Sequence, residues 1–180
     1  AGYISKAGHN VTVYNRTSSK AEKWAKEHKG KIAKTPAEAA KDSDFVFTCV
    51  GNDNDLKEVA IGKDGIFNTI KKNSIYIDNT TASAKVAREL YKNAKAHGFG
   101  FLDAPVSGGQ AGAEKGALTV MVGGDASDFE KAEKIINCYS KKVKLLGPSG
   151  SGQLAKMVNQ ICIAGLVQGL SEALNFGLNA

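Results

Sequence analysis

The sequence predicts an α/β protein built on a doubly wound, mostly parallel sheet that is followed by the start of a long helix. Short apolar runs rich in β-branched and aromatic residues alternate with segments whose apolar residues recur at helical spacing. The run 45–50 is apolar almost throughout, as expected of a strand buried on both faces of a parallel sheet. A loop rich in Gly and Ser at 147–152 separates this alternation from a helical pattern that continues to the last residue. Alternation of this kind is typical of sheets that carry helices on both faces.

The individual elements follow from apolar periodicity and from turn residues at their ends. Strands are expected at 11–15, 45–50, 74–78, 99–105, 118–122 and 142–146. Helices are expected at 19–27, 35–40, 54–61, 83–96 and 127–139. The helix at 35–40 has the clearest start, because Thr35 and Glu38 form a capping box with Pro36 at the first helical position. This order divides the chain into a domain of residues 1–148 and a helical segment of residues 149–180.

Composition excludes several classes of protein. The chain has 180 residues, of which 42% are hydrophobic and 23% charged, so disordered and fibrous classes are excluded. Its three cysteines, Cys49, Cys138 and Cys162, are widely spaced and have no Cys/His cluster around them. Neither a disulfide framework nor a metal site is therefore expected, and a reducing, cytoplasmic setting fits best.

The net charge of +6 raises the question of a nucleic-acid partner. Only Arg16 and Arg88 among the 24 basic residues are arginine, although base and phosphate recognition favours the guanidinium group. The lysines are spread over several expected helices instead of forming one stripe. We expect solvated helix faces and no nucleic-acid partner.

The segment after residue 148 is apolar enough to suggest a membrane-crossing helix. Polar residues interrupt it repeatedly, namely Gln153, Lys156, Asn159, Gln160, Gln168, Glu172 and Asn175. We therefore expect a helix buried between two domains or subunits, and no membrane partner. Gly165 and Gly169 have the spacing that allows close helix contact.

The two ends of the chain have the character of cuts. The sequence begins at Ala1 without an initiator Met, a signal peptide or a strand, and it stops within a helical pattern. A first strand with a glycine-rich dinucleotide turn would need about twenty residues before Ala1. The expectation is a chain that lacks that strand and turn.

A first candidate site follows the first expected strand, at Asn15, Arg16 and Thr17. In a dinucleotide-binding fold the residue that ends the second strand meets the adenosine ribose, and a nearby Arg accommodates the 2′-phosphate of NADP. Asn15 carries no charge that would repel a phosphate, and Thr17 adds a hydroxyl. Taken alone this signal is weak, because an arginine in a loop is more often simply solvated.

A second candidate is the glycine-rich segment after residue 105. Ser107, Gly108 and Gly109 offer a hydroxyl and backbone N–H groups to a small anion such as a carboxylate. The segment could be mistaken for a dinucleotide loop, but its glycine spacing is wrong for one. A purely structural turn is the alternative.

A third candidate lies at the start of the last helix. Lys156 and Gln160 share a helix face, and Asn159 is adjacent. Burying a lysine and two carboxamides in an apolar helix is costly unless they have a purpose, such as proton transfer. The alternative is a lysine that reaches along the helix to solvent.

Taken in order along the chain, these segments resemble the β-hydroxyacid dehydrogenases, a family that includes 3-hydroxyisobutyrate dehydrogenase, tartronate semialdehyde reductase and glyoxylate/succinic semialdehyde reductase. 6-Phosphogluconate dehydrogenase is a more distant relative. The matching segments are 7–9 with 14–17, 49–52, 78–81, 103–109 with 112–113, 118–124, and 150–152 with Lys156. The resemblance implies a Rossmann-like NAD(P)-binding domain, an interdomain helix leading to a C-terminal helical domain, and a homo-oligomer.

The resemblance also implies roles on the substrate side. Lys156 matches the family's catalytic lysine, and 107–109 match the segment that grips the substrate carboxylate. The family usually has Asn four residues after the lysine, where this chain has Gln160, so the role of that amide is less certain. Asn159 is a neighbouring amide that could share it.

On the cofactor side, the resemblance implies contacts from Cys49, Val50 and Gly51 and from Thr81, which match positions lining the nicotinamide and its ribose. Arg16 matches the 2′-phosphate contact of NADP-using members. NADP is therefore favoured over NAD.

The function that this implies is hydride transfer between NAD(P) and a small β-hydroxyacid or semialdehyde, as in 3-hydroxyisobutyrate dehydrogenase. Tartronate and glyoxylate/succinic semialdehyde reductase remain alternatives, because the sequence does not discriminate these substrates. A nucleotide-binding scaffold without catalysis is a second class of function, which the presence of Lys156 disfavours.

Overall fold

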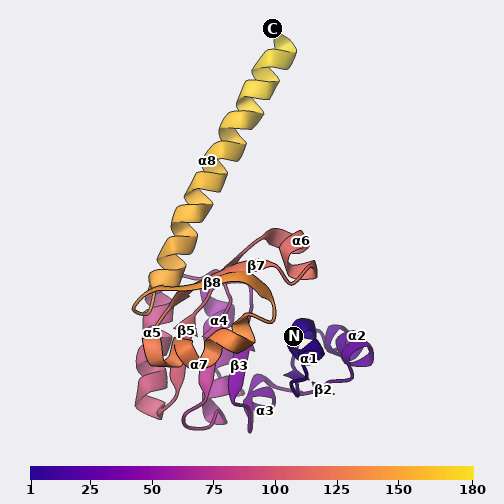
Figure 1. Ribbon diagram of the computed structural model, residues 1–180, viewed down its shortest axis with the longest axis vertical. Helices are drawn as coiled ribbons and strands as arrows, with labels where there is room; N and C mark the ends of the chain where they lie inside the picture. Colours follow the sequence, from indigo (N-terminus) through magenta and orange to yellow (C-terminus); the bar gives the residue numbers. More distant parts are fainter.

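The computed structural model describes residues 1–180 and has an α/β domain from which one long helix projects (Figure 1). In chain order the elements are α1 (Gly2–Lys6), β1 (Thr12–Val13), α2 (Ser18–His28), β2 (Lys31–Ile32), α3 (Pro36–Ala40), β3 (Phe45–Thr48), α4 (Asp53–Ile61), the 3-10 turn η1 (Ile66–Asn68), β4 (Ile75–Asp78), α5 (Ala84–His97), β5 (Gly100–Asp103), β6 (Val106–Ser107), α6 (Gly109–Glu114), β7 (Leu118–Gly123), α7 (Ala126–Ile136), β8 (Ser140–Gly147) and α8 (Ser151–Asn179).

Six strands form the main sheet in the order β3-β4-β5-β7-β6, and β8 pairs with β7. The pairs β3-β4, β4-β5 and β7-β8 are parallel, whereas β7 runs antiparallel to β5 and β6. Strands β1 and β2 form a separate parallel pair. The predicted fold class, a mostly parallel sheet of the Rossmann-like type, is confirmed.

The core lies on both faces of the sheet, because successive side chains of a strand point in opposite directions. On β4 and β5, Tyr76 and Phe101 pack in one cluster with apolar residues of α4 and α5. Ile75, Ile77 and Leu102 pack on the other face with residues of α7. Helices therefore cover the sheet on both sides, which is the arrangement that the alternating sequence pattern predicts.

The prediction that the run 45–50 is a strand buried on both faces is wrong in part. The strand spans only Phe45–Thr48, and Phe45 and Phe47 are half-buried. The reason is topological, because β3 is the edge of the six-stranded sheet, whereas all residues of β4 and β5 are buried. Strands β2 and β6 were not expected, since two residues carry no detectable periodicity.

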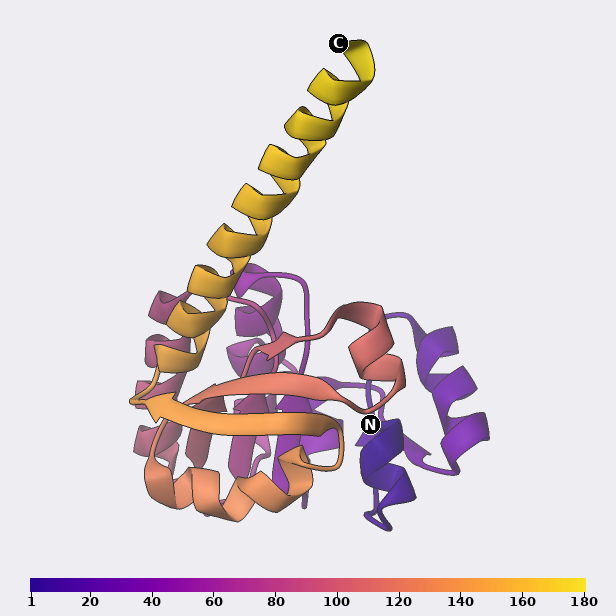
Figure 2. The ribbon, with the colours of Figure 1, turned by 45° about the horizontal axis from the view of Figure 1, so that its top comes forward.

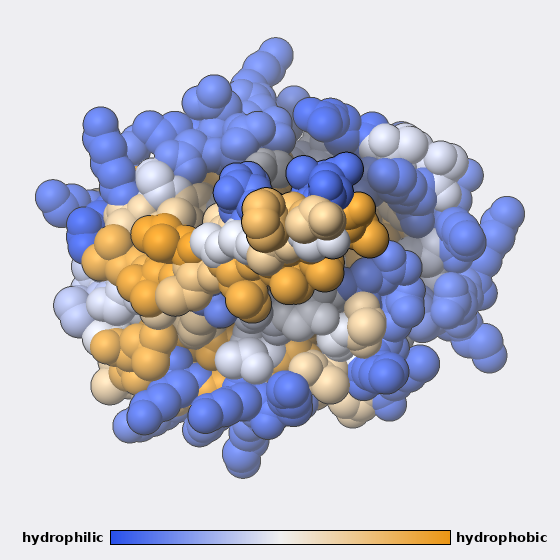
Figure 3. All heavy atoms as spheres, turned by 90° about the horizontal axis from the view of Figure 1, so that it is seen from above, coloured by the Kyte–Doolittle hydropathy of each residue, from blue (hydrophilic) through white to orange (hydrophobic).

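Helix α8 extends away from the domain in both ribbon views (Figures 1 and 2). By length and composition it could cross a membrane, and none of its most apolar 18-residue window is buried in this structure. Seen from above, its apolar side chains stand out against hydrophilic side chains at the edge of the domain (Figure 3). The expectation that α8 lies between domains or subunits stays a prediction.

One carboxylate in the core has an unusual environment. Asp78, at the end of β4, is fully buried. Its Oδ1 accepts hydrogen bonds from Thr48 Oγ1 at 2.8 Å and from the Thr80 N–H at 3.1 Å, whereas Oδ2 has no partner. Burial disfavours the charged form and raises the pKa of this carboxyl to about 6.

Replacing Asp78 with Asn is expected to flatten the pH dependence of stability. The folded-state pKa lies above the ordinary value of 3.8, so the folded state binds the proton more tightly than the unfolded state does. This contribution to the free energy of unfolding is present at low pH and is lost as the pH rises through about 6. We expect the free energy of unfolding of the wild type, measured with urea, to fall between about pH 4 and pH 7.5. This fall should exceed that of Asp78→Asn by about 2 kcal/mol. Parallel pH profiles would contradict this account.

Candidate active site

The carboxyl ends of the three parallel strands β3, β4 and β5 define one edge of the sheet. Their last residues, Thr48, Asp78 and Asp103, lie opposite one another in register. The loops that follow are tied together, since Asn79 Nδ2 donates to the Ala104 carbonyl at 2.7 Å. In open α/β sheets this edge is where ligands bind.

Hydrogen bonds also join the loop after β3 to the loop after β4. The Val50 N–H donates to Thr80 Oγ1 at 3.0 Å. Asp53, in the first turn of α4, accepts from the N–H of Ser83 at 2.8 Å and from its hydroxyl. Asn52 caps α4 by accepting from two N–H groups of its first turn. These bonds fix the two loops relative to each other.

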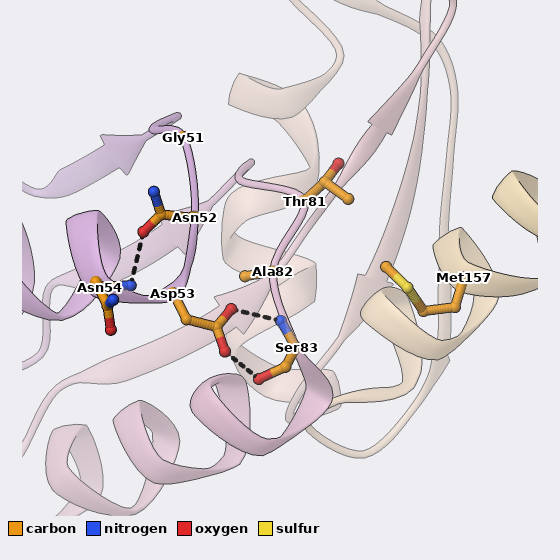
Figure 4. Close-up of a pocket in the computed structure, with 8 residues that line it drawn as sticks. All are labelled: Gly51, Asn52, Asp53, Asn54, Thr81, Ala82, Ser83 and Met157. Carbon is orange, nitrogen blue, oxygen red and sulfur yellow. Dashed lines mark hydrogen bonds between the residues drawn. The ribbon is translucent and has the colours of Figure 1, made fainter.

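An open cavity of about 440 Å³ lies between these loops and α8 (Figure 4). Its lining residues are Gly51, Asn52, Asp53, Asn54, Thr81, Ala82, Ser83 and Met157. Gly51 and Thr81, two residues expected at the cofactor, therefore line one cavity. Met157 reaches it from α8, next to the expected catalytic lysine. Cys49 lies beside this group, with Sγ 3.9 Å from the carbonyl oxygen of Asn79.

The residues after β1, which belongs to the separate two-stranded sheet, contact the domain at α4. Asn15 Oδ1 accepts the N–H of Thr17 at 2.8 Å, which holds a tight turn. The Arg16 side chain is 87% exposed, and its Nη1 lies 3.7 Å from Asp55 Oδ1 on α4. The structure thus brings Arg16 to the first turn of α4.

The first turn of α8 is held by Asp103, a residue whose role the sequence analysis missed. Its fully buried carboxylate accepts the N–H of Gly150 at 2.6 Å and the N–H of Gln153 at 3.1 Å. Ser149 Oγ lies 3.4 Å from the same group. Burial raises the pKa of Asp103, and the backbone N–H groups oppose that rise. A carboxylate at this position also complements the positive end of the helix dipole.

Gln153 is the second anchor of α8, and sequence reasoning treated it only as an interruption of an apolar helix. Its side chain is fully buried. Nε2 donates to the Thr80 carbonyl at 2.7 Å, and Oε1 accepts from the Ala82 N–H at 3.0 Å. The only sequence signal is its spacing, because it lies three residues before Lys156 on the same helix face.

Lys156 follows these anchors on α8 and is buried, with 8% of its surface exposed. Asn159 is half-buried and Gln160 is exposed, and their side chains lie 3.5 Å apart. Of the three expected catalytic residues, the lysine therefore has the most enclosed position. Gln160 lies outside the enclosed part of the site in this structure.

The expected carboxylate-binding segment connects β6 to α6. Ser107 ends β6 and is half-buried, and Gly108 and Gly109 are exposed. Both glycines have positive φ values, 136° and 59°, which disfavour other residues. Strand β6 and helix α8 both pack against β7. Ser107 and Lys156 thus belong to two elements that share β7 as a neighbour.

The residues present fit a nicotinamide dinucleotide at its adenosine ribose and at its nicotinamide end, but not at its pyrophosphate. The exposed guanidinium of Arg16 has the donors that a ribose phosphate needs, and residues 51–54 and 81–83 line a mostly polar cavity. A glycine-rich turn for the pyrophosphate is not among residues 1–180. The fold and the edge residues together define a dinucleotide-binding domain.

Comparison with known proteins agrees with this class. Residues 1–147 match the family described as the NAD binding domain of 6-phosphogluconate dehydrogenase. The chain is 56% identical to an uncharacterized oxidoreductase of Shewanella frigidimarina over 180 residues, which is all of this chain and 62% of the relative. It is 38% identical to a probable mitochondrial 3-hydroxyisobutyrate dehydrogenase of Dictyostelium discoideum, over 97% of this chain and 54% of the relative.

Among solved structures, the Mycobacterium tuberculosis 3-hydroxyisobutyrate dehydrogenase with L-serine matches with a TM-score of 0.88 and 30% identity. That match covers 96% of this chain and 58% of the solved one. The chain thus belongs to the β-hydroxyacid dehydrogenase family and contains its NAD-binding domain. It spans between about half and two thirds of the length of the relatives it matches.

Removing the Asp103 carboxylate is expected to destabilise the domain. Asp103→Ala leaves buried N–H groups at the start of α8 without an acceptor, which costs about 2–4 kcal/mol of unfolding free energy. Urea unfolding measures the loss. Asp44→Ala is the matched control, because it removes an exposed carboxylate paired with Lys71 and should cost less than about 1 kcal/mol. Equal losses in the two variants would contradict the anchoring role.

Proposed function

We propose that the protein is an NAD(P)-dependent oxidoreductase of the 3-hydroxyisobutyrate dehydrogenase type, acting on a small β-hydroxyacid or the corresponding semialdehyde. The observation that carries the proposal is the enclosed position of Lys156, one residue from Met157 in the cavity wall. The family membership and the relatives' names support the reaction class. Tartronate semialdehyde, glyoxylate and succinic semialdehyde remain alternative substrates.

In this proposal each group of residues has a separate task. A nicotinamide, when bound, supplies the hydride acceptor or donor. The Ser107 hydroxyl and the N–H groups of Gly108 and Gly109 bind the substrate carboxylate and orient the reacting carbon. In oxidation, neutral Lys156 accepts the proton of the substrate hydroxyl at Nζ, and in reduction its ammonium donates that proton. Asn159 or Gln160 donates a hydrogen bond to the same substrate oxygen.

The proposed function also accounts for the exposed apolar side chains of α8. We infer that α8 packs against further parts of the enzyme, including a second copy in a homo-oligomer, in a cytoplasmic protein. The match to the Mycobacterium tuberculosis enzyme supports only the assignment of α8 to an enzyme fold, because it covers 96% of the chain and must include most of the 29-residue helix. That likeness favours an enzyme helix over a membrane anchor.

Lys156→Met is expected to lower kcat of the full-length protein by at least about a hundredfold, the scale typical of a lost general acid or base. The dissociation constants of NADP⁺ and NAD⁺ should change little. Turnover with a panel of semialdehydes and both reduced cofactors measures the effect. Lys144→Met, at an exposed lysine on β8, is the control and should keep wild-type turnover.

Two outcomes would overturn the proposal. Wild-type turnover in Lys156→Met would exclude this lysine as the proton donor and acceptor. Tight cofactor binding by the wild type without turnover of any semialdehyde would favour a nucleotide-binding scaffold instead.

Arg16→Ala is expected to shift cofactor preference toward NAD. Loss of a charge-assisted contact to the 2′-phosphate should lower kcat/KM for NADPH by about tenfold or more, with little change for NADH. The ratio of the two kcat/KM values measures the shift. An unchanged ratio would remove the NADP preference from the proposal.

A further inference from the structure

Asp55 lies at the cofactor edge of the domain, in the first turn of α4. Its Oδ1 is 3.7 Å from Arg16 Nη1. Its Oδ2 accepts a hydrogen bond from Asn52 Nδ2 at 3.2 Å. The side chain is 35% exposed, against 87% for Arg16, so the carboxylate is the more firmly held partner. The ion pair joins residues 39 positions apart and connects the loop after β1 to the first turn of α4.

The carboxylate is held close to the backbone of Gly51, which lines the cavity. A Cβ at position 51 would lie 2.8 Å from Asp55 Oδ2, so the absence of a side chain there makes room for the carboxylate. The negative charge also complements the N-terminus of α4. Asp55 is therefore held in place by its own helix and by Asn52, independently of Arg16.

This position matters because Arg16 is the residue expected to receive a 2′-phosphate. Asp55 is the one acid that pairs with it. A phosphate approaching the guanidinium would have to share it with the carboxylate and would be repelled by a like charge. A ribose 2′-hydroxyl meets no such repulsion and can donate a hydrogen bond to a carboxylate.

We propose that Asp55 is a specificity-determining residue that opposes the 2′-phosphate and shifts the preference of this site toward NAD. The inference rests on the proposed function, because it concerns the cofactor of that site. Cofactor preference is then set by the Arg16–Asp55 pair, with the two side chains acting in opposite directions. The motif at 15–17 contains only the residue that favours the 2′-phosphate, and not the acid that opposes it.

The test is equilibrium binding by the full-length protein, measured by titration calorimetry with NADP⁺ and NAD⁺ at low ionic strength. Asp55→Asn keeps the size of the side chain and removes its charge. Binding of NADP⁺ should tighten by about two- to fivefold, and binding of NAD⁺ should stay unchanged or weaken. The gain should shrink at high salt, because the repulsion is partly exposed to solvent.

Glu58→Gln is the matched control, since it removes the same charge from the same helix three residues further on, at an exposed side chain. The ratio of the two dissociation constants should stay at the wild-type value in this variant. A ratio that moves equally in both variants would indicate only a general charge effect and would overturn the proposal.

The remaining outcomes separate this inference from the function on which it rests. If the wild type binds either cofactor and Asp55→Asn leaves the ratio unchanged, the inference alone fails. If the wild type binds neither cofactor, the proposed function fails and the inference fails with it.

Discussion

The site depends on one buried interaction, the contact between the Asp103 carboxylate and the first N–H groups of α8. A fully buried carboxylate is costly unless hydrogen bonds compensate for its lost hydration. Here the N–H groups of Gly150 and Gln153 provide that compensation, and the helix gains an acceptor for N–H groups that have no partner within it. The same contact fixes the start of α8 to the end of β5, and with it the position of Lys156.

From this anchor a continuous series of hydrogen bonds reaches the cofactor side of the domain. Gln153 joins α8 to the backbone of the loop after β4, and Thr80 in that loop accepts the N–H of Val50 in the loop after β3. Lys156 and the loops that line the cavity therefore share one framework of hydrogen bonds. Buried polar networks specify geometry when their members have hydrogen-bond partners. The bonds named here meet that condition. The neighbouring Asp78 accepts the Thr80 N–H at Oδ1, but its Oδ2 has no partner.

Much of the fold could be predicted from the sequence, because long elements carry a clear period. The helix expected at 83–96 spans Ala84–His97 in the structure. The segments that contain the candidate site residues follow the expected strands. Contacts between distant residues could not be predicted in this way. Asp103 lies about 50 positions from its partner Gln153, and Arg16 lies 39 from Asp55. Apolar periodicity reports only on neighbouring positions in the chain. It therefore assigned no role to Asp103 and did not predict that Gln160 is exposed.

The central claim is that the carboxyl edge of β3, β4 and β5 binds a nicotinamide dinucleotide beside Lys156. Hydrogen exchange of the full-length protein with and without cofactor tests it most directly, because it locates the bound surface without relying on turnover. The account predicts slower exchange on binding in the segments 15–17, 49–55 and 80–83, and in the first turns of α8. Exchange at the opposite end of the sheet, around Asn73 and Gly98, should not change. Protection confined to that opposite end, or found nowhere, would contradict the account.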